Sequence, residues 1–274
     1  MTLDQWRRGA STALSFSTFG LGGVVIGVII APVLLVLVRN AETRRRWMRK
    51  LIQLAFRGFI GLMRITGVLR YELHQVELLQ RPGLLIFANH PSLIDVIFLV
   101  ANTRHADCIV NGALAHNPFT RGPIKAAGYI TNKDPATVLL AAKESLARGN
   151  SLILFPEGTR TAPDGQVNFL RGGANIALRT ETAITPVLIS CVPTTLTKGE
   201  PWYHIPPQRI HISLKVLPDL PLANEPNKPL RERARELTCW LTDYFNKELE
   251  LFRHERDAKP DDGNKAHDYR HSGA

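Results

Sequence analysis

Short apolar runs alternate with stretches of helical periodicity along most of the chain. The runs are typical of buried or half-exposed strands and lie at residues 71–79, 84–88, 107–110, 128–130, 151–155, 184–192 and 209–216. Helical periodicity and helix-boundary residues predict helices at residues 93–100, 134–149, 172–180 and 229–254. Because strands alternate with helices, the pattern predicts an α/β fold with a mixed, largely parallel sheet flanked by helices.

The N-terminal part of the chain has a different pattern. Residues 9–38 carry no charge, and the most apolar part, residues 20–38, would span about 28 Å as a helix, close to the ~30 Å hydrocarbon core of a bilayer. Arginine and lysine are abundant after it, so this side is expected to face the cytoplasm. Residues 47–69 mix basic and apolar residues and predict an amphipathic helix in the membrane interface. A plain anchor with a solvated linker and a re-entrant helical hairpin are the alternatives.

Length and composition divide the chain into three parts. Its 274 residues allow one sizeable domain with an appendage, and 45% hydrophobic residues are enough for a core. We expect a membrane anchor with a basic interfacial helix over residues 1–70 and the α/β domain over residues 71–255. Residues 256–274 are polar and are predicted to be disordered.

The formal net charge of +10 indicates a negatively charged partner. Basic residues concentrate at 39–57, beside the apolar segment, which favours anionic membrane lipids, and no nucleic-acid motif is visible, so no nucleic-acid partner is expected. The three cysteines have neither disulfide-framework nor metal-ligand spacing, and Cys108 fits a core thiol. No metal site is expected.

The candidate chemistry begins where the apolar run 84–88 ends. His90 follows that predicted strand, and Asp95 falls in the first turn of the next predicted helix. A bend between strand and helix lets the Asp95 carboxylate reach one imidazole nitrogen, which leaves the other free to accept a proton. The alternative is structural: Ser92 and Asp95 fit a capping box, and His90 is then an ordinary loop histidine.

A second loop follows the predicted strand 151–155 and reads Phe155-Pro156-Glu157-Gly158-Thr159-Arg160. Together with Asn89-His90 and Asp95, it resembles the signatures of the glycerophospholipid acyltransferase family, which includes the 1-acylglycerol-3-phosphate acyltransferases. Both signatures are complete and stand in family order. The resemblance covers residues 84–190 well and the N-terminal segment loosely.

The resemblance implies that residues 71–255 form an acyltransferase domain. Such an enzyme moves a fatty acyl group from an acyl thioester to a hydroxyl of a lysophospholipid such as 1-acylglycerol-3-phosphate, and takes part in phospholipid biosynthesis. His90 and Asp95 would be catalytic, and Glu157, Gly158, Thr159 and Arg160 would bind the acceptor. The thioester, of coenzyme A or acyl carrier protein, is a co-substrate, so no cofactor is expected. The implied location is the cytoplasmic face of a bacterial inner membrane.

The chain departs from the family in one block, Gly-x-Ile-x-x-x-Arg, whose arginine helps to bind the acceptor phosphate. Here Asp134 stands at the arginine position, with Lys133 beside it. This weakens the expectation of lysophosphatidic acid as acceptor, and Asp134 also fits an N-cap. With residues 198–203, the block is similar to bacterial members associated with aryl-polyene lipid assembly. Residues 185–187 match the last family block or a plain core strand.

Three other functions stay open at this point. The chain could acylate a different lipid acceptor, or it could be a catalytically idle protein that binds anionic lipid, against which the intact His90–Asp95 pair argues. A lipid hydrolase could use His90 to activate water. A local salt bridge between Glu157 and Arg160 is the structural alternative to acceptor binding by that loop.

Overall fold

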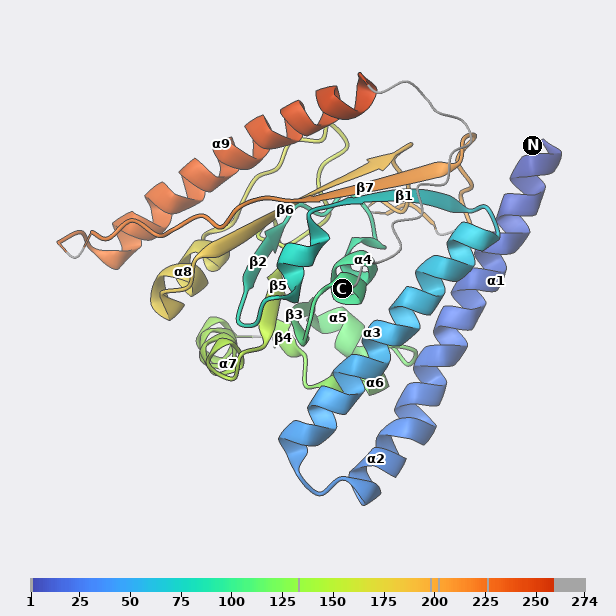
Figure 1. Cartoon of the computed structure of the whole chain (residues 1–274), viewed down its shortest axis with the longest axis horizontal. Coiled ribbons are helices and arrows are strands. Elements are labelled where there is room, and N and C mark those ends of the chain that lie inside the picture. The colour runs from blue at the N-terminus through green and yellow to red at the C-terminus, as the bar shows by residue number, and fades with distance from the viewer. Residues whose placement is uncertain (1, 133, 198, 202, 226, 259–274) are drawn as a thin grey trace, which may run out of the picture.

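The computed structural model describes residues 2–132, 134–197, 199–201, 203–225 and 227–258 (Figure 1). Its seven strands are β1 (Leu69–His74), β2 (Leu85–Ala88), β3 (Ala106–Asn111), β4 (Ile130–Asn132), β5 (Ser151–Leu154), β6 (Ile184–Val192) and β7 (Ile210–Val216). They form one sheet in the order β1-β7-β6-β2-β5-β3-β4. Every neighbouring pair is parallel except β6 and β7, which confirms the expected mixed, largely parallel sheet.

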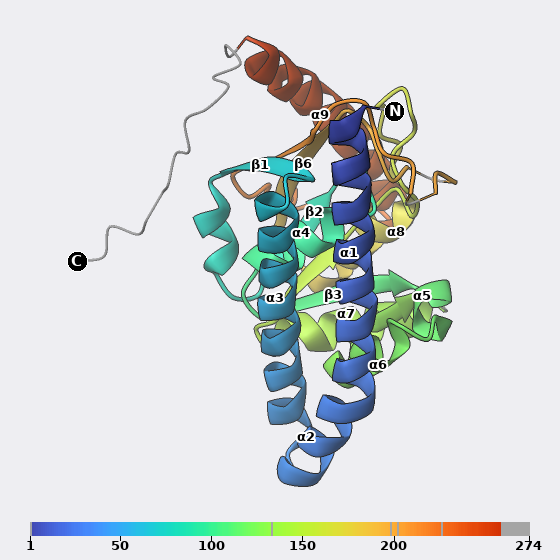
Figure 2. The same ribbon diagram turned by 90° about the vertical axis from the view of Figure 1, so that its right-hand side faces the viewer.

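Helices lie on both sides of the sheet (Figures 1 and 2). They are α1 (Leu3–Val25), α2 (Ala31–Leu37), α3 (Ala41–Ile65), α4 (Asp95–Asn102), α5 (Gly112–His116), α6 (Arg121–Ala127), α7 (Pro135–Ala147), α8 (Arg171–Thr180) and α9 (Leu230–Asp257). A 3-10 helix spans Val76–Gln80 and a π-helical turn spans Ile26–Ile30. The helix α9 extends into the tail that was expected to be disordered, and residues 259–274 lie outside the described part.

The central strands are buried on both faces, which explains why they are continuous apolar runs rather than alternating ones. All residues of β2 and β5 are buried. One large core cluster lies on the face covered by α3 and α4, and a second lies on the face covered by α7, α8 and α9. The predicted strand 71–79 is wrong in its second half, because Gln75 takes a left-handed conformation (φ 58°) that ends β1 and turns Leu79 into the core.

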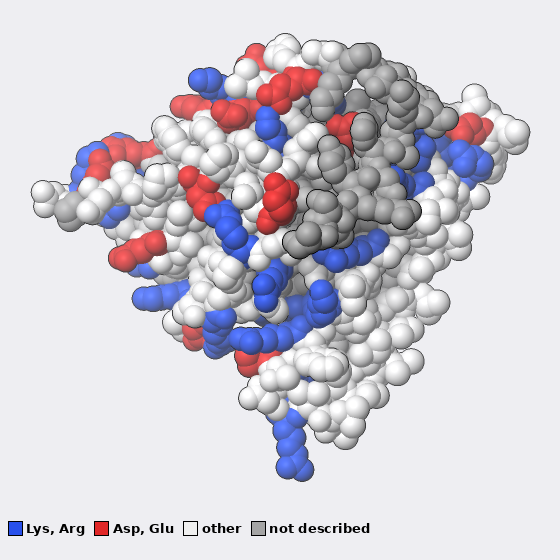
Figure 3. Space-filling model, viewed as in Figure 1, with Lys and Arg blue, Asp and Glu red and all other residues white. Residues whose placement is uncertain are grey.

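The N-terminal helices form a hairpin, with α1 and α2 as one rod beside α3 (Figures 1 and 2). The π-helical turn comes just before Pro32, which has no N–H for the regular hydrogen-bond ladder. The stretch Leu3–Leu37 is long and apolar enough to cross a membrane, and only 6% of its most apolar window is buried. Figure 3 shows a broad uncharged surface along this side of the molecule.

Helix α3 differs from the interfacial helix expected at residues 47–69. Its apolar face packs against α4 and contributes Met48, Ile52 and Phe59 to the core, so the protein itself covers most of that face. The sequence pattern could not separate these outcomes, because an amphipathic helix suits a protein core and a membrane interface equally well.

Two buried arginines attach the hairpin to the α/β domain. Arg8 on α1 donates hydrogen bonds to the carbonyl oxygens of Pro206, Pro207 and Gln208. Arg49 on α3 donates to Asp107 at 2.8 Å and to the Ala127 carbonyl at 3.0 Å. Since breaking a buried ion pair costs about 3–5 kcal/mol, the hairpin is an integral part of the fold.

Glycine allows α1 to approach the α5–α6 segment closely. A Cβ atom added to Gly23 would overlap the backbone carbonyl oxygen of Phe119, whereas one added to the adjacent Gly22 would meet nothing within 4 Å. We therefore expect Gly23→Ala to lower the free energy of unfolding by about 1–3 kcal/mol through overpacking. Gly22→Ala is the matched control and should be neutral or stabilising by up to ~1 kcal/mol.

Thermal unfolding of the full chain in detergent measures both substitutions. Equal melting temperatures for the Gly22→Ala and Gly23→Ala proteins would contradict the packing of α1 on the α5–α6 segment.

Candidate active site

The first candidate loop leaves the carboxyl end of β2. Asn89, the residue after the strand, is buried, and its side-chain amide donates to the Ile189 carbonyl and accepts from the Ile189 N–H, both at 2.8 Å. These two bonds continue the pairing of β2 with β6 for one residue beyond the strand. The backbone of His90 is therefore held firmly at the edge of the sheet.

The second loop leaves the carboxyl end of β5, the strand next to β2. The backbone N–H of His90 donates to Glu157 Oε1 and to Thr161 Oγ1, both at 3.0 Å. The Thr161 hydroxyl donates to Glu157 Oε1 at 2.7 Å, and the Thr161 N–H donates to the His90 carbonyl at 2.8 Å. The two loops thus form one hydrogen-bonded unit, as expected for loops at the carboxyl ends of adjacent parallel strands.

His90 and Asp95 meet within this unit, as the bend between strand and helix predicts. Nδ1 of His90 lies 3.1 Å from Oδ2 of Asp95, and the N–H of Ser92 donates to the same oxygen at 2.6 Å. An ionised carboxylate only accepts hydrogen bonds, so Nδ1 carries the proton and Nε2 presents a lone pair. The bond from the Ser92 N–H to Asp95 is one of the two bonds of the predicted capping box. The same Asp95 oxygen also contacts His90.

Burial controls the charges of the two carboxylates in the site. Asp95 is fully buried, and desolvation raises its pKa, while the hydrogen bond from His90 acts in the opposite direction. Glu157 is also buried, and desolvation raises its pKa, opposed by its bond from Thr161. Within the described residues Asp95 Oδ1 has no hydrogen-bond partner, so the His90 imidazole is the main side-chain partner of this carboxylate.

The imidazole itself remains accessible. The His90 side chain is 18% exposed, and its ring stacks on Phe155 with the centroids 4.2 Å apart. The stacking fixes the ring plane, and Asp95 fixes the rotation within that plane. A substrate can therefore reach a histidine whose orientation is already set, which is the arrangement that general-base catalysis needs.

Arg160 lies close to the pair, near enough for its positive charge to lower the pKa of Asp95. Its Nη1 donates to the carbonyl oxygens of Leu196 and Thr197, at 2.7 and 2.6 Å. The part of the chain that the structure describes contains no ion pair between Arg160 and Glu157, so the alternative of a local salt bridge is not supported. Since Nη1 carries both bonds, Nη2 and Nε remain available for a ligand.

The position of Gly158 requires a glycine. Its neighbour Thr159 makes no hydrogen bond among the described residues. Gly158 has φ +66°, a conformation that side chains disfavour, and a Cβ there would lie 2.8 Å from Leu170. Thr159 is exposed next to Arg160. The loop therefore keeps Glu157 inside the protein and presents residues 158–160 outward.

The remaining candidate blocks have structural roles. Asp134 caps α7 by accepting from the Thr137 N–H at 2.9 Å, and Lys133, Lys198 and Trp202 lie outside the described residues. Residues 185–187 form part of β6 and pair with β2. Sequence analysis assigned no role to Asn89, Phe155 or Thr161, although the first two belong to the signatures.

The comparisons agree with this architecture. A profile described as Acyltransferase matches residues 70–190. A Caenorhabditis elegans protein, acl-2, whose name places it among the 1-acyl-sn-glycerol-3-phosphate acyltransferases, is 34% identical over 133 residues, which are 46% of this chain and 45% of that protein. The Helicobacter pylori 1-acyl-sn-glycerol-3-phosphate acyltransferase is 30% identical over 132 residues, 46% of this chain and 54% of that protein.

The enzyme of the same name from Pseudomonas aeruginosa is 26% identical over 181 residues, covering 64% of this chain and 66% of its own length. The matches thus span about half to two thirds of these relatives. The crystal structure of the 1-acyl-sn-glycerophosphate acyltransferase PlsC from Thermotoga maritima has the same fold, with a TM-score of 0.61, 22% identity, and coverage of 87% of this chain and 98% of PlsC. Residues 70–190 therefore carry an acyltransferase-family domain, and the chain is similar in sequence to 1-acyl-sn-glycerol-3-phosphate acyltransferases and in fold to PlsC.

Proposed function

We propose that the chain is a membrane-bound O-acyltransferase that moves a fatty acyl group from an acyl thioester to a hydroxyl of a lipid acceptor. The observation that carries the proposal is the contact between His90 Nδ1 and the buried carboxylate of Asp95, 3.1 Å apart, at an accessible sheet edge. This geometry supports Nε2 of His90 as the base. The names of the relatives support 1-acylglycerol-3-phosphate as the acceptor.

The proposed reaction is a direct transfer. Nε2 of His90 takes the proton of the acceptor hydroxyl while its oxygen attacks the thioester carbonyl carbon. The C–S bond then breaks, and the leaving thiolate recovers a proton from the imidazolium. Asp95 stabilises that imidazolium, and because the thioester is already activated, the step needs no further cofactor. The donor is a thioester of coenzyme A or acyl carrier protein.

Arg160 is the proposed acceptor ligand. Its guanidinium lies near the His90–Asp95 pair, and its free donors suit a phosphate, which arginine binds in a forked geometry. Gly158 and Thr159 lie on the exposed side of the same loop and would contact the acceptor. In this proposal Glu157 orients the loops rather than the substrate, since its Oε1 accepts bonds from His90 and Thr161.

A different lipid acceptor is the second candidate. Asp134 occupies the position at which the family has a phosphate-binding arginine, and it is used as the N-cap of α7. Phosphate recognition at the site then rests mainly on Arg160. An acceptor with a smaller or differently placed anionic group fits that change.

We also propose that the protein is held at a membrane by the N-terminal hairpin, on the cytoplasmic face. The exposed apolar side chains of α1, the π-helical turn and α2 support this placement; they include Leu14, Leu21, Val28, Ile29, Val33, Leu35, Val36 and Leu37. The lipid substrates would then be close to the site, because Arg8 ties the first turns of α1 to residues 206–208, on the same side of the sheet as His90.

The first prediction concerns the base. His90→Ala should lower acyl transfer by about 10²- to 10⁴-fold, the usual contribution of a general base. His116→Ala, at an exposed histidine bonded only to its own helix at 2.7 Å, is the control and should keep full activity. Transfer from a labelled acyl thioester to a lysolipid measures both. Wild-type turnover in the folded His90→Ala protein would exclude this role.

The second prediction concerns the acceptor. Arg160→Ala should raise the KM for a phosphate-bearing acceptor by about 10- to 100-fold, the loss expected for a charge-assisted hydrogen bond, and should leave the thioester KM nearly unchanged. Arg160→Lys should recover part of the affinity. If Arg160 only holds the backbone of Leu196 and Thr197, its loss will lower the melting temperature and leave the acceptor KM as it was.

The third prediction concerns the hairpin. Leu21→Asp places a charge in the middle of the apolar stretch, where the side chain is 66% exposed, so it should weaken binding to phospholipid vesicles without unfolding the protein. Leu140→Asp on α7, at a side chain 62% exposed, is the matched control. Vesicle flotation gives the comparison, and equal flotation of both variants would argue against membrane contact by α1.

A further inference from the structure

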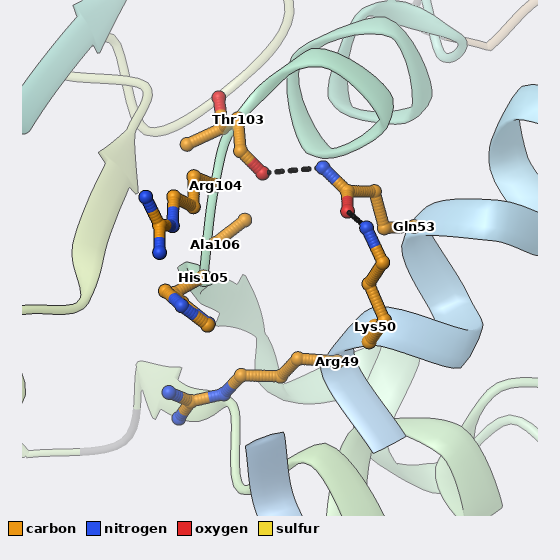
Figure 4. Close-up of a pocket in the computed structure, with 7 residues that line it drawn as sticks. All are labelled: Arg49, Lys50, Gln53, Thr103, Arg104, His105 and Ala106. Atoms are coloured by element: carbon orange, nitrogen blue, oxygen red, sulfur yellow. Dashed lines mark hydrogen bonds between the residues drawn. The ribbon is translucent and has the colours of Figure 1, made fainter. Parts of the chain in front are cut away.

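A polar cavity lies at the amino-terminal edge of the sheet, opposite to His90. It has a volume of about 240 Å³ and is formed by α3 and by the segment that joins α4 to β3 (Figure 4). The first residue of β5, Ser151, donates to the His105 carbonyl beside it, whereas the loop with Glu157 follows the other end of β5. The four residues of β5, at about 3.3 Å each, separate the two regions by roughly 13 Å.

The cavity is lined by positive charge. Arg49, Lys50 and Arg104 contribute three cationic side chains, and no carboxylate is among the described residues that line it. Figure 4 shows Arg104 and His105 on one side, Lys50 and Gln53 across from them, and Arg49 along the bottom. Lys50, Arg104 and His105 are exposed, so the cavity opens to solvent at this cationic rim.

Two buried polar groups of the lining have no partner. Arg49 uses Nη2 for Asp107 and Nε for the Ala127 carbonyl, but its Nη1 has no hydrogen-bond partner in the described chain. The hydroxyl of Thr103, a residue 1% exposed, is also without one. Buried polar atoms nearly always have partners, so two unpartnered donors in one cavity indicate a ligand that supplies acceptor oxygens.

Arg49, Lys50 and Gln53 are held in position by hydrogen bonds within the protein. Lys50 Nζ donates to Gln53 Oε1 at 3.1 Å, and Gln53 Nε2 donates to the Thr103 carbonyl at 2.8 Å, which links the two walls (Figure 4). His105 takes a left-handed conformation, φ 49°, that turns the chain around the cavity. The positions of Arg49 and Lys50 are therefore set by contacts within the fold, and Arg104 completes the rim from the exposed segment before β3.

The charge in the cavity is not balanced. Burial lowers the pKa of the His105 imidazole, and the positive charges of Arg104, Arg46, Arg49 and Lys50 lower it further. The buried Asp107 carboxylate pairs with Arg49 at 2.8 Å and accepts a hydrogen bond from the Ser145 hydroxyl at 2.6 Å. An anion in the cavity would remove this excess of positive charge.

We propose that this cavity is a phosphate-binding site separate from the acyltransferase site. A phosphate group offers more acceptor oxygens than a carboxylate, which has only two, so it suits a cavity that holds Arg49 Nη1 and two cations at the rim. The volume, equal to that of about eight waters at roughly 30 Å³ each, admits the group with part of its hydration. The phosphate belongs to an anionic lipid headgroup or to a soluble phosphate.

Binding of inorganic phosphate by the full chain in detergent, followed by isothermal titration calorimetry, tests the proposal. Lys50→Gln with Arg104→Gln removes the two exposed cations and should weaken phosphate binding at least about tenfold. Arg231→Gln with Arg235→Gln removes the same charge from exposed positions on α9 and should bind like the wild type. Arg160→Ala removes the ligand proposed for the acceptor phosphate at the other edge of the sheet and should leave in place the phosphate binding that depends on Lys50 and Arg104.

Vesicle flotation separates the two sources of the phosphate. If a lipid headgroup is the ligand, phosphatidic acid added to phosphatidylcholine vesicles will increase the flotation of the wild type but not that of the Lys50/Arg104 variant. If soluble phosphate is the ligand, the two proteins will float alike while calorimetry still separates them. Equal phosphate affinity of the Lys50/Arg104 and Arg231/Arg235 variants would overturn the proposal, as would loss of all phosphate binding on Arg160→Ala.

Discussion

The structure depends on one buried contact, the hydrogen bond between the His90 imidazole and the Asp95 carboxylate. A carboxylate removed from water is costly, and Asp95 has two donors to offset that cost, the Ser92 N–H and His90 Nδ1. One of these two donors is the imidazole of His90, whose orientation matters for its proposed role as a base. The buried Asp95 carboxylate therefore fixes the orientation of the imidazole through Nδ1 and leaves Nε2 without a contact to Asp95.

The sheet brings the remaining parts of the site to this contact. Because β2 and β5 are adjacent and parallel, the loops that follow them lie at the same edge, and His90 N–H, Glu157 and Thr161 join them. The hairpin of α1, α2 and α3 is attached to the same domain through Arg8 and Arg49, with its apolar side exposed. In the proposed function, His90 is an accessible base close to the apolar hairpin, an arrangement that suits acyl transfer between lipid substrates.

The parts that the sequence predicts are those governed by local pattern. The apolar runs of β2, β5 and β6, the N-cap Asp134 and the bend that lets Asp95 reach His90 follow from near neighbours in the chain. Contacts between distant residues could not be predicted. Arg49 is hydrogen-bonded to Asp107, 58 positions away in the sequence, and Thr161 is hydrogen-bonded to His90, 71 positions away. The packing of α3 on α4 also depends on tertiary context, because its apolar face suits either a core or a bilayer.

The tautomer of His90 tests the central claim most directly. Nitrogen-15 NMR of the full chain, with the His90 signal assigned by its loss in a His90 variant, reports which ring nitrogen carries the proton in the neutral imidazole. The account predicts a protonated Nδ1 and an unprotonated Nε2 in the wild type, and loss of that preference in Asp95→Ala. A proton on Nε2 in the wild type would contradict it, since His90 could not then serve as the base that faces the substrate.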